Sequence, residues 1–442
     1  MSARVSDSET SPLLNLPNGH EQAKRPSKAR AIIWSLVTLV FAAAVVLMTA
    51  ANAGSDGLRV WLGMMPYDVD LAAEVILKTA PVIDGHIDLP WLVRMIFKND
   101  PAKFDLEKDM PYHVDIERLR KGKVGGFFWY AVYTPCPDPE EEGPDYVNAT
   151  LSVRDTMEQI DLSKVLIDKY SDTFALATTA ADVKKAIRAG KIASLLGIEG
   201  AHQISASIGT LRQFHELGVR YMTLTHTCNN PFADSCGMAW GGIEPRWHGL
   251  NPALGPQLVK EMNRLGMFVD LSHTSDETAR QAIELSEAPV IWSHSSARAV
   301  HNHPRNVPDD ILQLIGEGEG KKDAVIMVNF APGFVGPTDE EANLERVAAH
   351  VEHIAEVAGR KHVGLGSDFD GIASTPSGLE DVSKYPALIS LLYSRGWSKY
   401  DLAGLAGGNL LRVMEGMERV AADLQRKGVA PAMDVYDRRT DL

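Results

Sequence analysis

Helical and strand-like segments alternate along most of this chain, and this alternation constrains the fold more than any other feature. Between residues 181 and 368, stretches with helical spacing of apolar residues each precede a short apolar run typical of a buried strand. Two similar apolar runs occur before residue 181. The predicted strands are Pro81–Asp88, Val124–Tyr133, Ile192–Glu199, Val219–His226, Met267–His273, Pro289–His294, Ala324–Phe330 and His362–Asp368. Apolar strands that alternate with helices indicate an α/β protein with a parallel sheet.

Eight such units favour a closed (β/α)8 barrel of the TIM type, which we place over residues 65–425. An open, doubly wound sheet is the alternative. No Gly-x-Gly-x-x-Gly pattern follows a predicted strand, so a dinucleotide-binding version of that sheet is not indicated.

Titratable residues stand where the predicted strands stop. In a parallel barrel these carboxyl ends open onto one face, where active sites of this fold lie. A single histidine at such a place is usually a core residue satisfied by the backbone, but six of eight strands repeat the pattern. The residues are His86, Asp88, Glu199, His226, His273, His294 and Asp368.

Imidazole and carboxylate groups are ligands for zinc and similar divalent ions. His86 and Asp88 are two positions apart, so in a strand both side chains would point to the same face. The whole set exceeds one closed zinc site and suits two metal ions that share a bridging carboxylate. Thiolate ligands are not indicated. The predicted reaction is hydrolysis of an amide, ester or phosphate bond, and residue spacing does not choose among these.

Arg305 follows the sixth predicted strand and lies on the same face as His294. A guanidinium can hold a carboxylate through two parallel hydrogen bonds. An ordinary surface arginine near a helix start explains Arg305 equally well, since Pro308 marks that start. Its neighbours Arg298, His301 and His303 compete for the same role.

The N-terminal region predicts a membrane anchor. Residues 1–30 are polar and aperiodic, as in a disordered tail, and residues 31–53 form an uncharged run long enough to cross a bilayer as one helix. Positive charge before this run predicts a cytoplasmic tail and a single-pass type II protein with a lumenal or extracellular catalytic domain. A cleaved signal peptide is the alternative. Residues 426–442 form a polar C-terminal tail without a GPI-anchor signal.

Charge and cysteine content narrow the partners and the compartment. The formal net charge of −14 argues against a nucleic-acid surface, which would be basic. The three cysteines suit an oxidising compartment with one disulfide and one free thiol, although their positions do not choose the pair. Asn148-Ala149-Thr150 is a glycosylation sequon if this side is lumenal.

Several long motifs resemble those of the membrane (renal) dipeptidases, a family of zinc peptidases with an amidohydrolase-like barrel. The resemblance extends from about Val82 to Glu415. The motifs are PVIDGHIDLP, GIEG, YMTLTHTCNNPFAD, VDLSHTS, VIWSHSSARAV, RNVPDDIL, IMVNF and GLGSDFDG.

The resemblance implies hydrolysis of dipeptides with free amino and carboxyl ends, by a hydroxide bound to two Zn²⁺ ions that attacks the peptide carbonyl. His86 and Asp88 would bind one zinc ion, His273 and His294 the other, and Glu199 both. The remaining implied roles are oxyanion stabilisation by His226, carboxylate binding by Arg305, and, for Asp368, binding of the free amino group with proton transfer to the leaving amine.

The resemblance also implies a disulfide between Cys136 and Cys228, which leaves Cys236 free. Relatives that carry a signal peptide and a GPI anchor differ from this chain, so their topology does not transfer. The segment after Cys236 has a composition of its own and leaves the substrate preference open. A homodimer is also left open.

Two other functions compete with a dipeptidase. Another amidohydrolase-like enzyme, an amidase or a deaminase, would use the same type of metal site. Such enzymes often carry a bridging lysine late on the fourth strand, where this chain has Thr225 and His226. A non-catalytic membrane receptor of the same fold would have lost metal ligands, and all five implied ligands are present.

Overall fold

The structure is a computed structural model that describes residues 27–52, 55–132, 134–143, 145–238 and 242–439. The chain forms two compact units, Met1–Met64 and Met65–Leu442. Most of the predicted N-terminal tail and the last three residues of the predicted C-terminal tail lie outside the described residues.

The N-terminal unit contains α1 (Lys28–Asn52) and α2 (Asp56–Trp61). Helix α1 coincides with the predicted anchor and carries exposed apolar side chains, including Trp34 and Phe41. At 1.5 Å per residue, the apolar stretch Lys28–Ala50 is roughly 35 Å long, which exceeds the hydrocarbon core of a bilayer at about 30 Å. Among the described residues, this is the one helix that is long and apolar enough to cross a membrane.

The second unit is a nearly closed barrel of eight parallel strands, as predicted. Neighbouring strands follow chain order, and a short ninth strand, β3 (Phe174–Leu176), pairs with β4 outside the barrel. The barrel strands are β1 (Val82–Ile87), β2 (Val124–Val132), β4 (Ile192–Glu199), β5 (Val219–Thr223), β6 (Phe268–Asp270), β7 (Val290–Trp292), β8 (Ala324–Val328) and β9 (Val363–Leu365).

The first and last barrel strands meet beyond their own ends. Ile87 and Phe369 form a parallel bridge. The amide of Asp368 donates to the carbonyl of His86 (3.0 Å), and the amide of Asp88 donates to the carbonyl of Phe369 (2.8 Å). The barrel therefore closes through the backbone of three predicted site residues.

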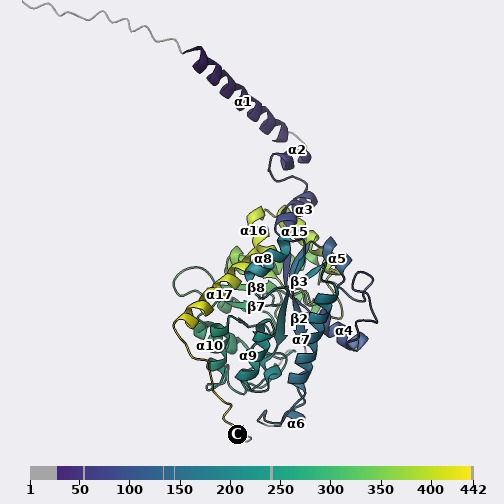
Figure 1. Cartoon of the computed structure of the whole chain (residues 1–442), viewed down its shortest axis with the longest axis vertical. Helices are drawn as coiled ribbons and strands as arrows, with labels where there is room; N and C mark the ends of the chain where they lie inside the picture. The colour runs from purple at the N-terminus through teal and green to yellow at the C-terminus, as the bar shows by residue number, and fades with distance from the viewer. Residues whose placement is uncertain (1–26, 53–54, 133, 144, 239–241, 440–442) are drawn as a thin grey trace, which may run out of the picture. The chain divides into compact units, whose positions relative to one another are not determined.

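Helices surround the strands (Figure 1). A helix precedes each barrel strand, in agreement with the alternation predicted from the sequence. The helices are α3 (Val69–Thr79), α4 (Leu89–Phe97), α5 (Ile116–Lys121), α6 (Pro139–Glu142), α7 (Ser152–Lys169), α8 (Ala180–Arg188), α9 (Ile208–Glu216), α10 (Gly255–Leu265), α11 (Asp276–Leu285), α12 (Asp309–Leu312), α13 (Pro332–Val335), α14 (Leu344–Val357), α15 (Tyr385–Ser394), α16 (Lys399–Ala403) and α17 (Asn409–Arg426).

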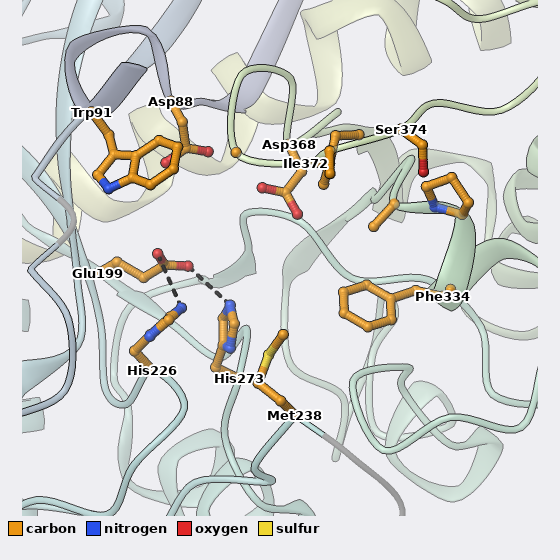
Figure 2. Close-up of a pocket in the computed structure, with 15 residues that line it drawn as sticks. Asp88, Trp91, Glu199, His226, Met238, His273, Phe334, Asp368, Ile372 and Ser374 are labelled. Carbon is orange, nitrogen blue, oxygen red and sulfur yellow. Dashed lines mark ion pairs between the residues drawn. The ribbon is translucent and has the colours of Figure 1, made fainter. Parts of the chain in front are cut away.

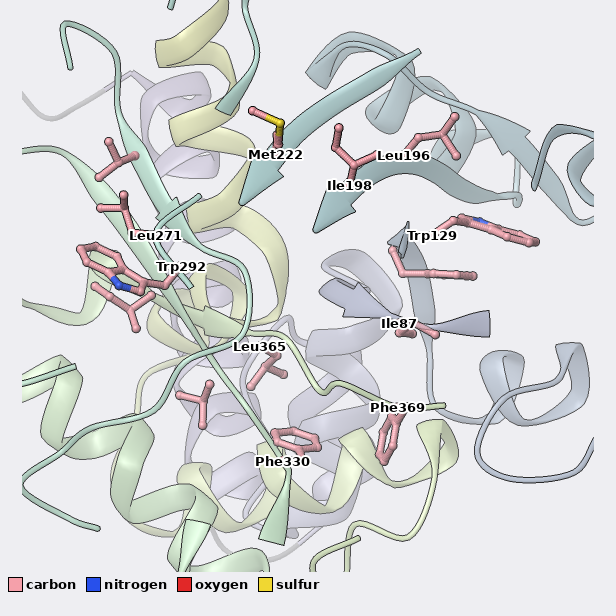
Figure 3. Packing of buried hydrophobic residues seen from close by; sticks show 14 of the residues in the cluster. Ile87, Trp129, Leu196, Ile198, Met222, Leu271, Trp292, Phe330, Leu365 and Phe369 are labelled. Atoms are coloured by element: carbon pink, nitrogen blue, oxygen red, sulfur yellow. The ribbon is translucent and has the colours of Figure 1, made fainter. Parts of the chain in front are cut away.

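Successive side chains of a strand point to opposite faces, so the buried apolar residues of the strands form two clusters. One residue set, with Trp129, Ile198 and Trp292, packs in the larger cluster (Figure 3). The alternating set, with Phe128 and Tyr221, joins the smaller one.

Helix α17 contributes Leu410, Val413, Met414 and Met417 to the smaller cluster. It also reaches the start of β8 through an ion pair between Arg412 and Asp323. Helix α17 therefore packs at the amino ends of the strands, away from the carboxyl ends where the predicted site residues lie.

The segment after α17 packs onto the barrel. The amide of Ala432 donates to Glu261 (3.1 Å), its carbonyl accepts from Arg212 (2.8 Å), and Tyr436 is buried. This part of the predicted polar tail is held by specific contacts.

Candidate metal centre and active site

All the predicted titratable site residues lie at the carboxyl ends of the barrel strands, but fewer of them belong to strands than expected. His86 is in β1 and Glu199 ends β4. His226, His273, His294 and Asp368 lie two or three residues past the ends of their strands.

The strand argument for Asp88 is wrong, because β1 ends at Ile87 and Asp88 occupies the N-cap position of α4. Aspartate at this position usually accepts a hydrogen bond from the first turn of the helix. The side chain of Asp88 makes no such bond, and its Oδ2 lies 3.2 Å from His86 Nε2. His86 and Asp88 still converge, through the turn into α4 rather than along one strand face.

Glu199 lies among three imidazoles. Its Oε1 is 2.9 Å from His273 Nε2 and 3.2 Å from His294 Nε2, and its Oε2 is 3.5 Å from His226 Nε2. Figure 2 shows Glu199 directed at His226 and His273. All four side chains are buried. One carboxylate therefore faces the ring nitrogens of three separate loops.

His294 connects this group to the other side of the site. Its Nε2 lies 3.1 Å from that of His273, and its ring centroid lies 3.7 Å from that of His86. His86 Nε2 is in turn 3.7 Å from Asp368 Oδ1. The seven predicted residues thus form one continuous cluster.

Hydrogen bonds fix the orientation of two imidazoles. The hydroxyl of Ser293 donates to Asp270, so its oxygen accepts from Nδ1 of His294 at 2.8 Å. The hydroxyl of Tyr221 donates to the carbonyl of Gly85 and lies 3.2 Å from Nδ1 of His86. With the proton on Nδ1, the Nε2 lone pairs of His86 and His294 face the site, as metal ligands require.

The backbone is strained at the same place. His273 has a φ of 65° and Asp368 a φ of 67°, in the left-handed region, which residues other than glycine adopt only in a few per cent of cases. Gly371 passes so close to Asp88 that an added Cβ would lie 2.2 Å from Oδ2. The surrounding fold holds these loops in conformations that bring the side chains together.

Burial controls the charges in the cluster. It lowers the pKa of His86 to about 4 and the pKa values of His226, His273 and His294 well below the usual range, so these rings are neutral near pH 7. Burial also raises the pKa values of Glu199 and Asp88 well above their usual range. Neutral imidazoles are ready to bind a metal, and a cation would favour the charged forms of both carboxyl groups.

This donor set fits divalent metal ions. Asp88 Oδ2 is buried without a hydrogen-bond donor, and the site offers nitrogen and oxygen atoms of the kind that zinc binds. His86, His294 and Asp368 form one candidate group of ligands, and Glu199, His226 and His273 form another. A third group, Cys136, His202 and Cys228, does not fit, because its cysteines are joined in a disulfide.

Arg305 is buried, at 3% exposure, behind the cluster. Its Nη1 donates to Ser295 Oγ (3.2 Å) and its Nη2 to the carbonyl of His294 (3.1 Å), whereas its Nε has no hydrogen-bond partner. In the part of the chain that the structure describes, no carboxylate forms an ion pair with Arg305. A buried guanidinium without a counter-ion is costly unless an anion joins it.

The alternatives to Arg305 are less suitable. Both Nη groups of Arg298 donate to Asp276. Arg298 is therefore already paired with a carboxylate, whereas none of Arg298, His301, His303 and Arg305 lines the cavity beside the cluster.

This cavity has a volume of about 370 Å³ and a partly apolar wall. Glu199, His226, His273, Asp88 and Asp368 line its polar side. The apolar lining residues were not predicted, because no titratable group marks them in the sequence. They include Trp91, Met238, Ala331, Pro332, Phe334 and Ile372.

The cysteines are arranged as the resemblance implied. Cys136 and Cys228 form a disulfide with a Cα–Cα distance of 6.0 Å, and Cys236 is free. Cys136 Sγ lies 3.3 Å from Thr227 Oγ1, which is 3.2 Å from Nδ1 of His226. The disulfide is therefore adjacent to the site. Asn148 is exposed on the loop after α6.

Comparison with known proteins identifies the family. The family described as "Membrane dipeptidase (Peptidase family M19)" matches residues 71–428. Dipeptidase verJ of Clonostachys rogersoniana is 44% identical over 368 residues, which cover 83% of this chain and 92% of that protein.

Solved structures agree with this result. A metallo peptidase from Rhodobacter sphaeroides, liganded with a phosphinate mimic of the dipeptide L-Ala-D-Ala, is 26% identical, with a TM-score of 0.66 over 76% of this chain and 99% of that one. The probable dipeptidase PvdM from Pseudomonas aeruginosa is 22% identical and shares the fold, with a TM-score of 0.69 over 80% and 100%. This chain therefore belongs to the membrane dipeptidase family, peptidase family M19, and is a dipeptidase.

Proposed function

We propose that this protein is a zinc-dependent dipeptidase with two metal ions, which hydrolyses dipeptides that have free amino and carboxyl ends. The observation that carries the proposal is the convergence of four buried side chains, with the carboxylate oxygens of Glu199 2.9–3.5 Å from the Nε2 atoms of His226, His273 and His294. Membership of a dipeptidase family supports the same reaction.

His86 and Asp88 would hold one zinc ion, and His273 and His294 the other, with Glu199 between them. When bound, two such ions lower the pKa of water and polarise a carbonyl group. The hydrogen bonds of Ser293 and Tyr221 hold two of the ligand rings in place.

His226 would donate a hydrogen bond to the oxygen of the attacked carbonyl. It lines the cavity and is neutral near pH 7. Its Nε2 lies 3.5 Å from Oε2 of Glu199. A donor placed where negative charge develops stabilises the transition state.

The ends of the substrate would meet opposite charges. Asp368 lines the cavity and would bind the free amino group, then pass a proton to the leaving amine. Arg305, buried without an anion, would bind the free carboxylate through charge-assisted hydrogen bonds. A longer peptide could not satisfy both groups, which explains a preference for dipeptides.

The remaining parts of the proposal concern location. We propose that α1 is an uncleaved signal anchor, that the barrel faces the lumen or the exterior, and that Asn148 is glycosylated there. The length and apolarity of α1 and the disulfide Cys136–Cys228 support this arrangement. A homodimer stays a prediction.

A substrate panel tests the proposal against the other amidohydrolase-like activities. The purified protein with Zn²⁺ is given dipeptides, their C-terminal amides, N-acyl amino acids and nucleobases. We expect cleavage of free dipeptides to exceed that of the other classes. Activity on N-acyl amino acids or nucleobases alone would contradict the proposal.

A further inference from the structure

Phe334 stands between the cavity and Arg305. It belongs to the short helix α13 and lines the cavity, whereas Arg305 does not. The centroid of its ring is 5.3 Å from the guanidinium carbon of Arg305 and 4.6 Å from the ring centroid of His303. Two side chains outside the metal-ligand cluster therefore hold the ring.

A substrate carboxylate that reaches Arg305 must lie beside this ring. The Nη groups of Arg305 already donate to protein oxygens, and only Nε lacks a partner. The carboxylate belongs to the second residue of a dipeptide, so the side chain of that residue branches from the atom next to the carboxylate. This side chain must also lie near Phe334.

The cavity wall next to Phe334 in the chain is apolar. Ala331 and Pro332, on the same turn, line the cavity together with Met238. The charged lining residues Asp88, Glu199 and Asp368 already have roles in the proposed site. Figure 2 shows Trp91 beside Asp88, on the far side of the cavity from Phe334. The wall near Arg305 thus offers apolar contact to the second residue, and Trp91 lies elsewhere.

The same turn also reaches the other end of the substrate site. Asn329 follows β8, and its Nδ2 donates to Asp368 Oδ2 at 2.9 Å, while its Oδ1 accepts from the amide of Ala331. Residues 329–334 therefore extend from the residue proposed for the amino group to the one proposed for the carboxylate. This connection fixes the position of Phe334 relative to a bound dipeptide.

We propose that Phe334 is a specificity-determining residue that selects dipeptides with an apolar second residue. The inference rests on the proposed function, since it takes Arg305 as the carboxylate-binding group. Contact between an apolar side chain and an aromatic wall favours binding through removal of both surfaces from water.

The test compares four dipeptides that share their first residue and end in Gly, Ala, Leu or Phe. The kcat and KM values are measured for the wild-type zinc enzyme and for the Phe334→Ala and Phe334→Leu variants, together with zinc content. Phe334→Ala should lower the Leu-to-Gly ratio of kcat/KM by about tenfold, the usual range for lost apolar contact in a pocket. The change should lie mainly in KM, because the contact exists before and during the reaction. Phe334→Leu should restore part of the ratio.

Trp91→Leu is the matched control. It removes another aromatic ring from the cavity wall, distant from Phe334, and should leave the Leu-to-Gly ratio within about twofold of wild type, well inside the change expected for a lost contact. An equal change in this ratio for Trp91→Leu would overturn the assignment to Phe334.

Three other results would also overturn the inference. Equal losses on all four dipeptides with reduced zinc content would make Phe334 a structural residue. Equal gains on all four would make it a barrier in front of Arg305. A wild-type zinc enzyme that cleaves no dipeptide would overturn the proposed function as well, whereas normal cleavage with an unchanged ratio would overturn only the selectivity.

Discussion

Glu199 occupies a position that no other residue of the site duplicates. It ends β4 and points into the space between three imidazoles, with its carboxylate oxygens 2.9–3.5 Å from their Nε2 atoms. Burial raises the pKa of this carboxyl group well above its usual range, and a bound cation would favour its charged form. In the proposed function, Glu199 is the ligand shared by both metal ions.

Glu199→Gln should remove this bridge. The amide keeps the volume of the side chain but not the negative charge, so we expect zinc binding to weaken and dipeptide turnover to fall below detection, with the fold retained. Zinc content, turnover and circular dichroism are measured on the same preparation. Wild-type turnover in this variant would contradict the assignment.

Arg305→Ala should weaken binding of substrates that have a free carboxylate. Losing one partner of a desolvated charge pair costs a few kcal/mol, so we expect kcat/KM for a free dipeptide to fall by about a hundredfold. The C-terminal amide of the same dipeptide is the control, since it cannot form the ion pair. A loss of the same size on the amide would show that Arg305 supports the fold of the site instead.

The strands and loops show what sequence patterns can and cannot predict. All eight barrel strands were predicted, because each is a short apolar run next to a helix. The end of β4 at Glu199 was predicted correctly, whereas most of the other ends were predicted too late. Leu224 and Leu271 are buried although they lie past β5 and β6, so apolar character continues into loops that turn over the barrel. The amides of Leu224 and Leu271 still donate to the carbonyls of Asp270 and Ile291 on the neighbouring strands, at 3.1 and 2.8 Å, before the chain turns away.

Most site residues that could be predicted from the sequence have titratable side chains. Histidines and carboxylates stand at the ends of six of the eight predicted strands, and the barrel topology brings them together. Phe334 and Met238 have no titratable group, and nothing in the sequence shows that the segments which carry them line the cavity. The three residues of β3 are too few for a periodic signal.

A buried histidine on helix α14, which is not a candidate metal ligand, should make the stability of the fold depend on pH. His350 on α14 accepts from the amide of Ala297 at 3.0 Å, and its other ring nitrogen lies 3.0 Å from the carbonyl of Val335. Burial lowers its pKa to about 4, against 6.5 in the unfolded chain. Between these pKa values the unfolded state binds a proton that the folded state does not bind. The free energy of unfolding therefore decreases as the pH falls from 6.5 towards 4.

His350→Gln should remove this contribution, which amounts to at most about 3 kcal/mol at pH 4. Unfolding free energies of both proteins are measured in urea from pH 7 to pH 4. We expect the wild type to lose more stability over this range than the variant. Because zinc release affects both proteins, it cancels in the difference. Parallel pH profiles would contradict the role of His350.

At the scale of the whole molecule, the apolar helix and the proposed active site belong to different compact units. The unit Met65–Leu442 contains the barrel, both apolar clusters and every residue of the proposed site. The unit Met1–Met64 contains the apolar helix α1.

Residues 65–442 alone should therefore fold, bind zinc and cleave dipeptides with the kcat/KM of the full chain, and should stay in the soluble fraction. The full chain should sediment with membranes and resist alkaline extraction, because α1 is long enough to span the bilayer. Alkaline release of the full chain would contradict the anchor, and loss of activity from residues 65–442 would contradict the domain boundary.

The most direct test of the proposed metal centre is the zinc content of the purified protein together with its dipeptidase activity before and after chelation. We expect two zinc ions per chain, loss of dipeptide cleavage when a chelator removes them, and recovery when Zn²⁺ is returned. Undiminished cleavage by protein shown to contain no metal would contradict the account.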